Sequence, residues 1–271
     1  MKRLSWAVAL VTALCSVAWA DEGLPTPLRQ IGFDQRLGES LPLELRFRDE
    51  TGREVALRDY FGARPVVLSL NYYGCPMLCT VTLNGLASAL DVLTSLDAGR
   101  EFEVVTVSFD ANEGPELAAK KKGQYLARYK RPTAEAGWHF LTGGQASIDE
   151  LTKAVGFRYA WDEETRQFAH PAGVVVLTPE GRISRYLYGI EYAPKDLKLA
   201  LMESARGRIG NFIEQAILYC YRYDPMTGRY SARIMRVTQV GAILTVLGLL
   251  AFVVLSLRRE RAAAPAVAEG R

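Results

Sequence analysis

The stretch Asn71–Leu86, NYYGCPMLCTVTLNGL, decides the fold of this chain, because a strand gives way to a helix within it. The apolar run Pro65–Asn71 predicts a buried strand. Leucines at helical spacing predict a helix over Val81–Leu93. Cys75 and Cys79 therefore lie where a central strand ends and a helix begins.

The two cysteines are four residues apart, so a helix that opens at Pro76 would place both sulfurs on one face. The unpaired N–H groups and the dipole at a helix N-terminus favour thiolate over thiol. Such a pair can close a disulfide or hold one soft metal ion. A disulfide across so short a loop removes little entropy from the unfolded chain and would stabilise it only modestly. The spacing therefore favours a redox or a metal-binding role.

The first residues, Met1–Ala20, have the pattern of a secretory signal peptide. Lys2 and Arg3 form the charged part, and Trp6–Val17 form an apolar run that is too short to cross a bilayer. Ala18–Ala20 has the small residues of a cleavage site. We therefore expect an exported protein, in a compartment where disulfides are permitted.

Near the other end, Val237–Leu257 is an almost unbroken apolar run of about 21 residues, long enough to span a membrane as a helix. Arg258, Arg259 and Arg261 follow it directly. Together with the signal peptide, this pattern predicts a single-pass protein of the inner membrane, with its globular domain on the periplasmic face and a short cytoplasmic tail.

The segment between these ends predicts an α/β domain. The expected strands are a hairpin of Leu43–Phe47 and Val55–Leu57, then Phe102–Phe109, Trp138–Leu141, Phe157–Trp161, Gly173–Thr178 and Arg182–Tyr188; the expected helices are Pro115–Tyr129, Ser147–Val155 and one from Pro194. This order favours a mostly parallel sheet with an antiparallel edge hairpin. The cysteine pair would then lie at the carboxyl edge, where open α/β sheets keep their sites.

Composition and motifs exclude several classes of protein. The formal net charge is +3 over 271 residues, and no basic run with interleaved aromatics indicates nucleic-acid binding. The sequence has no Gly-rich phosphate loop, no GxSxG elbow and no HExxH motif.

The chain has two histidines, and they differ in context. His139 lies inside a short strand between two aromatic residues, which favours a packing role. His170 precedes a proline in a loop that opens into the apolar strand Gly173–Thr178. The proline restricts the histidine to an extended backbone, so His170 is the better candidate for a functional residue.

Three motifs, CPMLC from Cys75, SFDANEGPE from Ser108 and HPAGVVVLTPEGRI from His170, resemble the Sco/SenC family over about Leu43–Arg206. Its members are membrane-anchored copper proteins of thioredoxin fold that take part in assembling cytochrome c oxidase. The resemblance implies a thioredoxin-like α/β fold with an N-terminal β-hairpin extension, plus one C-terminal transmembrane helix. It also implies that Cys75, Cys79 and His170 bind one copper ion.

The chemistry of these residues agrees with that implication. Two thiolates and an imidazole form a soft set that suits Cu(I) and can also hold Cu(II). Structural zinc normally takes four protein ligands, and a fourth is absent unless Cys220 supplies it. Cys220 lies in an aromatic-rich segment before the membrane span and could pair between chains, ligate metal or stay reduced.

The chain also departs from the family pattern, in which an acidic residue commonly lies between the cysteines and a proline follows the second. Here Met77 and Leu78 fill the gap and Thr80 replaces the proline. The missing acidic charge puts the copper affinity in question, whereas Met77 is better explained by packing than as a thioether ligand. Asp110 is placed equally well for a role near the site and for making a turn before the helix at Pro115.

Together these observations divide the chain into a signal peptide at 1–20, an extended lead-in at 21–40, a thioredoxin-like domain at 41–206, a membrane-proximal segment at 207–236, a transmembrane helix at 237–257 and a cytoplasmic tail at 258–271. The expected function is that of a copper metallochaperone whose partner is the copper-bearing subunit of cytochrome c oxidase or another copper or thiol protein. The alternative is a membrane-anchored thiol-disulfide reductase in which Cys75 attacks a partner disulfide and Cys79 resolves it.

Overall fold

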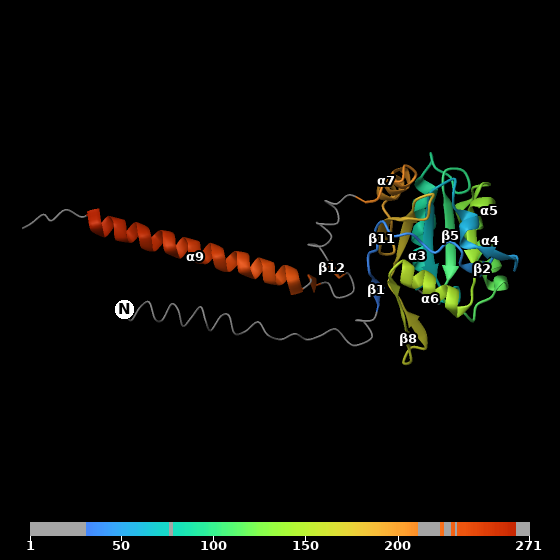
Figure 1. The fold of residues 1–271 in the computed structure, drawn as a ribbon, viewed down its shortest axis with the longest axis horizontal. Coiled ribbons are helices and arrows are strands. Elements are labelled where there is room, and N and C mark those ends of the chain that lie inside the picture. Colours follow the sequence, from blue (N-terminus) through green and yellow to red (C-terminus); the bar gives the residue numbers. More distant parts are fainter. Residues whose placement is uncertain (1–30, 76–77, 211–222, 225–228, 231, 264–271) are drawn as a thin grey trace, which may run out of the picture. The chain divides into compact units, whose positions relative to one another are not determined.

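A five-stranded sheet in the order β11-β10-β4-β5-β6 forms the centre of the globular part (Figure 1). Its strands are β4 (Val66–Asn71), β5 (Glu103–Ser108), β6 (Trp138–Leu141), β10 (Gly173–Leu177) and β11 (Ile183–Tyr188). Strands β4, β5 and β6 are parallel, whereas β10 runs antiparallel to β4 and β11 antiparallel to β10. This confirms the predicted parallel centre with an antiparallel hairpin at one edge.

The computed structural model describes residues 31–75, 78–210, 223–224, 229–230 and 232–263. Its helices in the globular part are η1 (Leu57–Tyr60), α3 (Leu78–Val92), α4 (Pro115–Tyr129), α5 (Ala134–Gly137), α6 (Gln145–Ala154) and α7 (Pro194–Ser204). Helix α4 has the predicted bounds because a proline, which needs no N–H partner in the first turn, opens it. The helices predicted from Val81 and Ser147 begin three and two residues earlier than expected.

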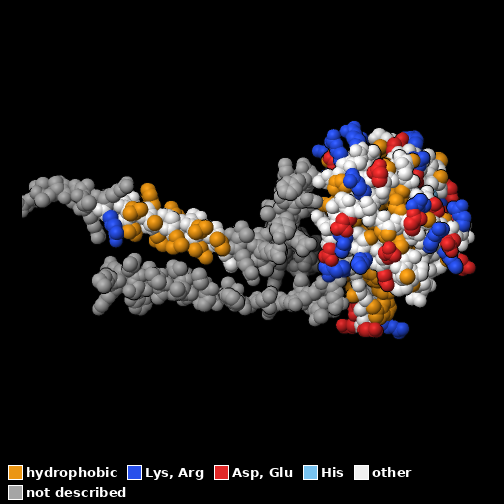
Figure 2. Space-filling model, viewed as in Figure 1, with side chains coloured by type: hydrophobic (Ala, Val, Ile, Leu, Met, Phe, Trp, Pro, Cys, Tyr) orange, Lys and Arg blue, Asp and Glu red, His pale blue; other side chains and the backbone are white. Residues whose placement is uncertain are grey.

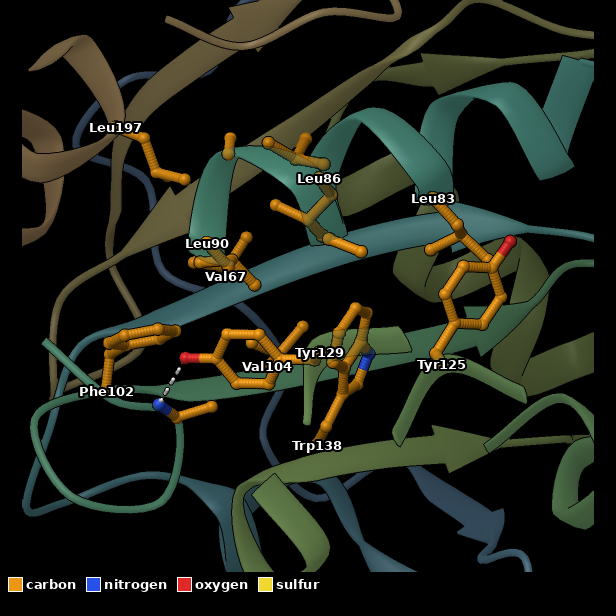
Figure 3. Packing of buried hydrophobic residues seen from close by; sticks show 14 of the residues in the cluster. Val67, Leu83, Leu86, Leu90, Phe102, Val104, Tyr125, Tyr129, Trp138 and Leu197 are labelled. Atoms are coloured by element: carbon orange, nitrogen blue, oxygen red, sulfur yellow. Dashed lines mark hydrogen bonds between the residues drawn. The ribbon is translucent and has the colours of Figure 1, made fainter. Parts of the chain in front are cut away.

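One face of the sheet packs against α3, α4 and α7 (Figure 3). The strands contribute small apolar side chains such as Val67 and Val104, and Trp138 fills the space beneath α4. The indole N–H of Trp138 donates to Thr106 Oγ1 at 3.0 Å, so this buried polar group is satisfied. Gly85 lets α3 approach its neighbours closely, because a Cβ there would lie 1.8 Å from the carbonyl oxygen of Ile190.

The other face packs against α6, η1 and a short hairpin of β2 (Arg46–Arg48) and β3 (Glu54–Ala56). Its core contains side chains from alternate positions of the same strands, because successive residues of a strand point to opposite faces. Cys75 and Cys79 belong to this second cluster of buried residues. The predicted N-terminal hairpin is therefore present, and it helps to cover the face on which the cysteines lie.

Two further short sheets differ from the sequence prediction. Part of the lead-in forms a strand, β1 (Gly32–Phe33), which pairs with β7 (Phe157–Arg158). The single strand predicted over Phe157–Trp161 is wrong: the chain leaves β7 after two residues and starts β8 (Ala160–Asp162), which pairs with β9 (Gln167–Ala169). Strand β9 ends one residue before His170, so this β8–β9 hairpin leads directly into the candidate site.

The C-terminal part forms a unit of its own, with β12 (Tyr223–Asp224), β13 (Arg229–Tyr230) and the 32-residue helix α9 (Ala232–Ala263). The segment Gln239–Ser256 of α9 has a mean hydropathy of 2.3 and none of it is buried, so the helix is long and apolar enough to cross a membrane. Figure 2 shows the apolar side chains along it. The predicted signal peptide, Met77 and Cys220 lie outside the described residues.

Candidate metal centre

Cys75, Cys79 and His170 converge at one point, as the sequence predicted. Their ligand atoms all lie within 4.8 Å of one another. The three residues are buried, with exposed fractions of 7%, 2% and 6%. Both cysteines are reduced. Two residues come from the β4–α3 junction and the third from the loop between β9 and β10, so the fold brings together positions about 90 residues apart in the sequence.

Backbone N–H groups of the β4–α3 junction point at the two sulfurs. The N–H of Tyr72 donates to Cys79 Sγ at 3.3 Å, and the N–H of Cys79 donates to Cys75 Sγ at the same distance. The two sulfurs therefore lie close together at the start of α3, whereas Pro76, the residue predicted to open the helix, lies outside the described residues. These donors orient the sulfurs toward each other.

The expected preference for thiolate is wrong for Cys79 in the metal-free protein. Burial is the largest effect and raises the pKa of the Cys79 thiol, and the hydrogen bond with Cys75 raises it further. The backbone N–H of Tyr72 opposes these effects but does not outweigh them. A thiol that is only 2% exposed loses the hydration its charged form needs, and the partial charge of a helix end does not replace it.

The imidazole of His170 presents one nitrogen to the sulfurs. Its Nε2 lies 3.1 Å from Cys79 Sγ, and its Nδ1 lies 3.0 Å from the carbonyl oxygen of Pro171. A carbonyl can only accept, so Nδ1 donates to it, and Nε2 is the nitrogen that faces the thiols. Such a hydrogen bond on the far nitrogen is how proteins fix the tautomer of a metal-binding histidine.

An aromatic wall lies beside the imidazole: the rings of Tyr72, Phe109 and Phe157 pack against His170, and those of Tyr159 and Phe168 pack against Phe109. The rings of Phe109 and Tyr72 lie 5.3 and 5.9 Å from the His170 ring. Burial, followed by a hydrogen bond with the Cys75 side chain, raises the pKa of Tyr72. The wall limits the access of water, and so it keeps the thiols and the imidazole in an apolar environment.

The sequence analysis missed Glu113, whose carboxylate accepts hydrogen bonds from the backbone of Tyr73 and Gly74 directly before Cys75. Glu113 lies within the motif SFDANEGPE, but its partners are 39 and 40 residues away, so no local pattern indicates the contact.

Two other polar candidates have local roles. The carboxylate of Asp110 accepts from the backbone and the side chain of Asn112, both at 2.9 Å, so the turn interpretation is confirmed. His139 lies with Nε2 3.3 Å from Glu103 and its ring 4.4 Å from the ring of Tyr60. Among the described residues, neither belongs to a group that could hold a metal ion.

The donor set fits a soft metal ion. Two atoms bound to one ion at about 2.0–2.3 Å lie at most about 4.6 Å apart, so the observed limit of 4.8 Å requires only small side-chain adjustments. Two sulfurs and one imidazole nitrogen, with no carboxylate in the set, suit copper better than a hard cation. Structural zinc prefers four protein ligands, and the described residues supply three.

The fold and the site thus define a thioredoxin-like α/β protein with a buried metal centre of two thiols and one imidazole. The SCO1/SenC family profile matches residues 34–203, and the chain belongs to this family.

Solved structures of related fold support the assignment. An Aquifex aeolicus VF5 protein classed as an electron transfer protein is 28% identical, with a TM-score of 0.56 over 64% of this chain and 96% of its own. ScoI of Arabidopsis thaliana, solved with copper bound, is 18% identical, with a TM-score of 0.50 over 64% of this chain and 99% of its own, and supports the fold alone. A comparison with curated proteins gave no match.

Proposed function

We propose that this protein binds one copper ion through Cys75, Cys79 and His170 and delivers it to the copper-bearing subunit of cytochrome c oxidase. The observation that carries the proposal is the convergence of two buried thiols and an imidazole whose Nε2 faces them. The metal is then cargo, and three protein ligands leave room for the ligands of a recipient. The family membership supports the choice of metal, because the members of this family are copper proteins.

The recipient follows from the family resemblance, because members take part in assembling cytochrome c oxidase. The test is transfer: the copper-loaded protein is mixed with the copper-free domain of the oxidase subunit, and the metal content of each is measured after separation. Copper that stays entirely on this protein would contradict the delivery role and leave the binding role standing.

Helix α9 supports a membrane location. The signal-peptide pattern and the arginines after the apolar segment favour the inner membrane, with the globular part on the periplasmic side. Protease added outside intact spheroplasts should digest the domain of residues 31–209 and spare a tag at the C-terminus. Protection of the domain would contradict this orientation.

The direct test of copper binding uses the full chain in detergent, loaded anaerobically with Cu(I). The wild type should retain one copper per chain. His170→Ala should bind copper at least about tenfold more weakly, because even the loss of a residue that only orients a ligand typically has an effect of this size. His139→Ala is the matched control, because it removes the other histidine, which lies against Glu103 and Tyr60, and should leave copper binding unchanged. Equal retention by the wild type and His170→Ala would contradict the assignment.

The same thiols could instead act as a reductase of exported disulfides. Both are reduced and close together, which suits that chemistry. Their burial argues against it, because a partner disulfide must reach the sulfur of Cys75, the attacking residue, which is only 7% exposed. Rapid reduction of a model disulfide by a wild type that retains no copper would favour the reductase.

A further inference from the structure

Glu113 extends from the loop after β5 to the turn that carries Cys75. Its carboxylate accepts hydrogen bonds from the N–H of Tyr73 at 2.6 Å, the N–H of Gly74 at 2.5 Å and the hydroxyl of Ser108 at 2.5 Å. Bonds to a charged acceptor are about twice as strong as neutral ones. The two backbone donors belong to the two residues directly before Cys75.

The same turn is held from its other side by the side chain of Tyr73. The phenol hydroxyl lies 2.8 Å from the carbonyl oxygen of Leu141 and 3.0 Å from that of Thr106. Tyr73 is 2% exposed, and its buried backbone N–H has the Glu113 carboxylate as its hydrogen-bond partner. The sheet therefore fixes the side chain of Tyr73, and Glu113 fixes the backbone of Tyr73 and Gly74.

The glycine at position 74 leaves room for the Glu113 carboxylate beside the turn. A Cβ at position 74 would lie 3.1 Å from Glu113 Oε1, closer than side chains normally pack, so a larger residue than glycine would push the carboxylate away. The loop of Glu113 is itself ordered by its N–H, which donates to the carbonyl oxygen of Asp110 at 3.1 Å.

We infer that Glu113 is a positioning residue for the metal centre: it fixes the Tyr73–Gly74 turn so that Cys75 lies within bonding reach of Cys79 and His170 before metal arrives. This inference rests on the proposed copper-binding function. Contacts of this kind, which orient a ligand without touching the metal, typically change metal affinity by about 10- to 100-fold.

A purely electrostatic role predicts the opposite sign. The negative charge of Glu113 contributes to the raised pKa of the Cys79 thiol, although less than burial does. If charge were its main effect, removing it would favour the thiolate and strengthen copper binding. If position is its main effect, the same change weakens copper binding.

The test compares Glu113→Gln with Glu116→Gln in the full chain in detergent. Glu116 is exposed in the first turn of α4, so its replacement makes the same change of charge without touching the Cys75 turn. Amide hydrogen exchange at Tyr73 and Gly74 is measured on the metal-free protein, and Cu(I) affinity is measured by competition with a chromophoric chelator.

Glu113→Gln should speed exchange at both amides and weaken Cu(I) affinity about tenfold, while Glu116→Gln should change neither. A folded Glu113→Gln protein with faster exchange and unchanged or tighter copper binding would overturn the inference. Glu113→Asp keeps the charge and loses the reach of one methylene, so it should also weaken copper binding; wild-type affinity in this variant would overturn the inference too.

Two further measurements apply if Glu113→Gln does not fold or if the wild type binds no copper. If Glu113→Gln does not fold, Gly74→Ala displaces the carboxylate more gently and should show the same direction of change, whereas unchanged affinity would overturn the inference. If the wild type itself binds no copper, the proposed function fails. The rate at which Cys75 and Cys79 react with an alkylating reagent then tests the positioning: faster reaction in Glu113→Asp, which keeps the charge, supports it, and an equal rate overturns it.

Discussion

The two halves of the metal centre are held in place by different forces. The thiol half, at the β4–α3 junction, is fixed by directional hydrogen bonds: backbone N–H groups point at the sulfurs, and Glu113 holds the backbone of the preceding turn. The imidazole half, before β10, is fixed mainly by aromatic rings packed against His170, with one hydrogen bond between Nδ1 and the carbonyl of Pro171 and one between Nε2 and Cys79.

This difference predicts different sensitivities to mutation. A hydrogen-bonded turn loses its geometry when one acceptor is removed, because a buried donor is then left without a partner. An aromatic cluster tolerates changes of chemistry but responds to changes of volume. The thiol half should therefore be disturbed by isosteric polar changes, and the imidazole half by truncation of an aromatic ring.

The largest expected loss of copper affinity comes from replacing the ligands themselves. Cys79→Ser should weaken Cu(I) binding more than His170→Ala, because Cu(I) prefers sulfur to nitrogen or oxygen. We expect copper affinity to fall at least about 100-fold in the serine variant and at least about tenfold in the alanine variant. For comparison, loss of a residue that only orients a ligand typically weakens metal binding about 10- to 100-fold. Chelator competition measures both. Equal losses would show that the two halves contribute equally.

The next effect concerns the aromatic wall. Phe109 is 1% exposed and lies against His170, so Phe109→Ala should lower the free energy of unfolding by about 3–5 kcal/mol. It should also weaken copper binding by the folded protein, because the imidazole loses its packing. Urea unfolding gives the first quantity, and chelator competition gives the second.

The matched control for this change is Phe102→Ala. Phe102 is fully buried at the other end of β5, in the cluster beneath α3 and α4. Phe102→Ala should lower the free energy of unfolding by a similar amount and leave copper affinity unchanged. If both alanine variants lose copper affinity equally, the aromatic wall has no specific role and general loosening explains the effect.

The smallest effect is expected in the β2–β3 hairpin, where the carboxylate of Asp49 holds a turn that carries none of the three candidate ligands. Burial of Asp49 raises its pKa, but hydrogen bonds from Thr51 and Arg53 outweigh this and leave the pKa lowered. Its stabilisation should thus be present above the ordinary aspartate pKa and be lost as pH falls through the lower folded value.

Asp49→Asn should therefore lower the free energy of unfolding by about 1.5–3 kcal/mol at neutral pH. The difference from the wild type should shrink at acid pH, where both side chains are neutral. Copper affinity should not change. Urea unfolding at a series of pH values measures this difference in the free energy of unfolding. A difference that grows at acid pH would contradict the prediction.

Much of the fold could be predicted from the sequence because the pattern of apolar residues directly reports burial. Strand β4 is buried on both faces and is apolar except for Ser69 and Asn71, and the proline at 115 marks the start of α4. The β8–β9 hairpin could not be predicted, because the aromatic run from Phe157 to Trp161 has the composition of one strand. The chain breaks it at Tyr159, whose ring packs against Phe109 from a distant strand.

The ligands of the candidate site could also be predicted, because the thiol spacing and the histidine before a proline are local features and the resemblance to the Sco/SenC family joins them into one ligand set. The supporting residues could not. Glu113 acts on a turn 39 and 40 residues away, and the raised pKa of Cys79 depends on how deeply the fold buries it. Local sequence predicted the opposite shift because it shows the helix end and not the burial.

X-ray absorption at the copper edge tests the central claim most directly, using the anaerobically loaded full chain and His170→Ala. We predict one copper per chain with two sulfur ligands and one imidazole nitrogen in the wild type, and the loss of the imidazole signal in the variant. Copper bound without sulfur, or an imidazole signal that persists in His170→Ala, would contradict the account.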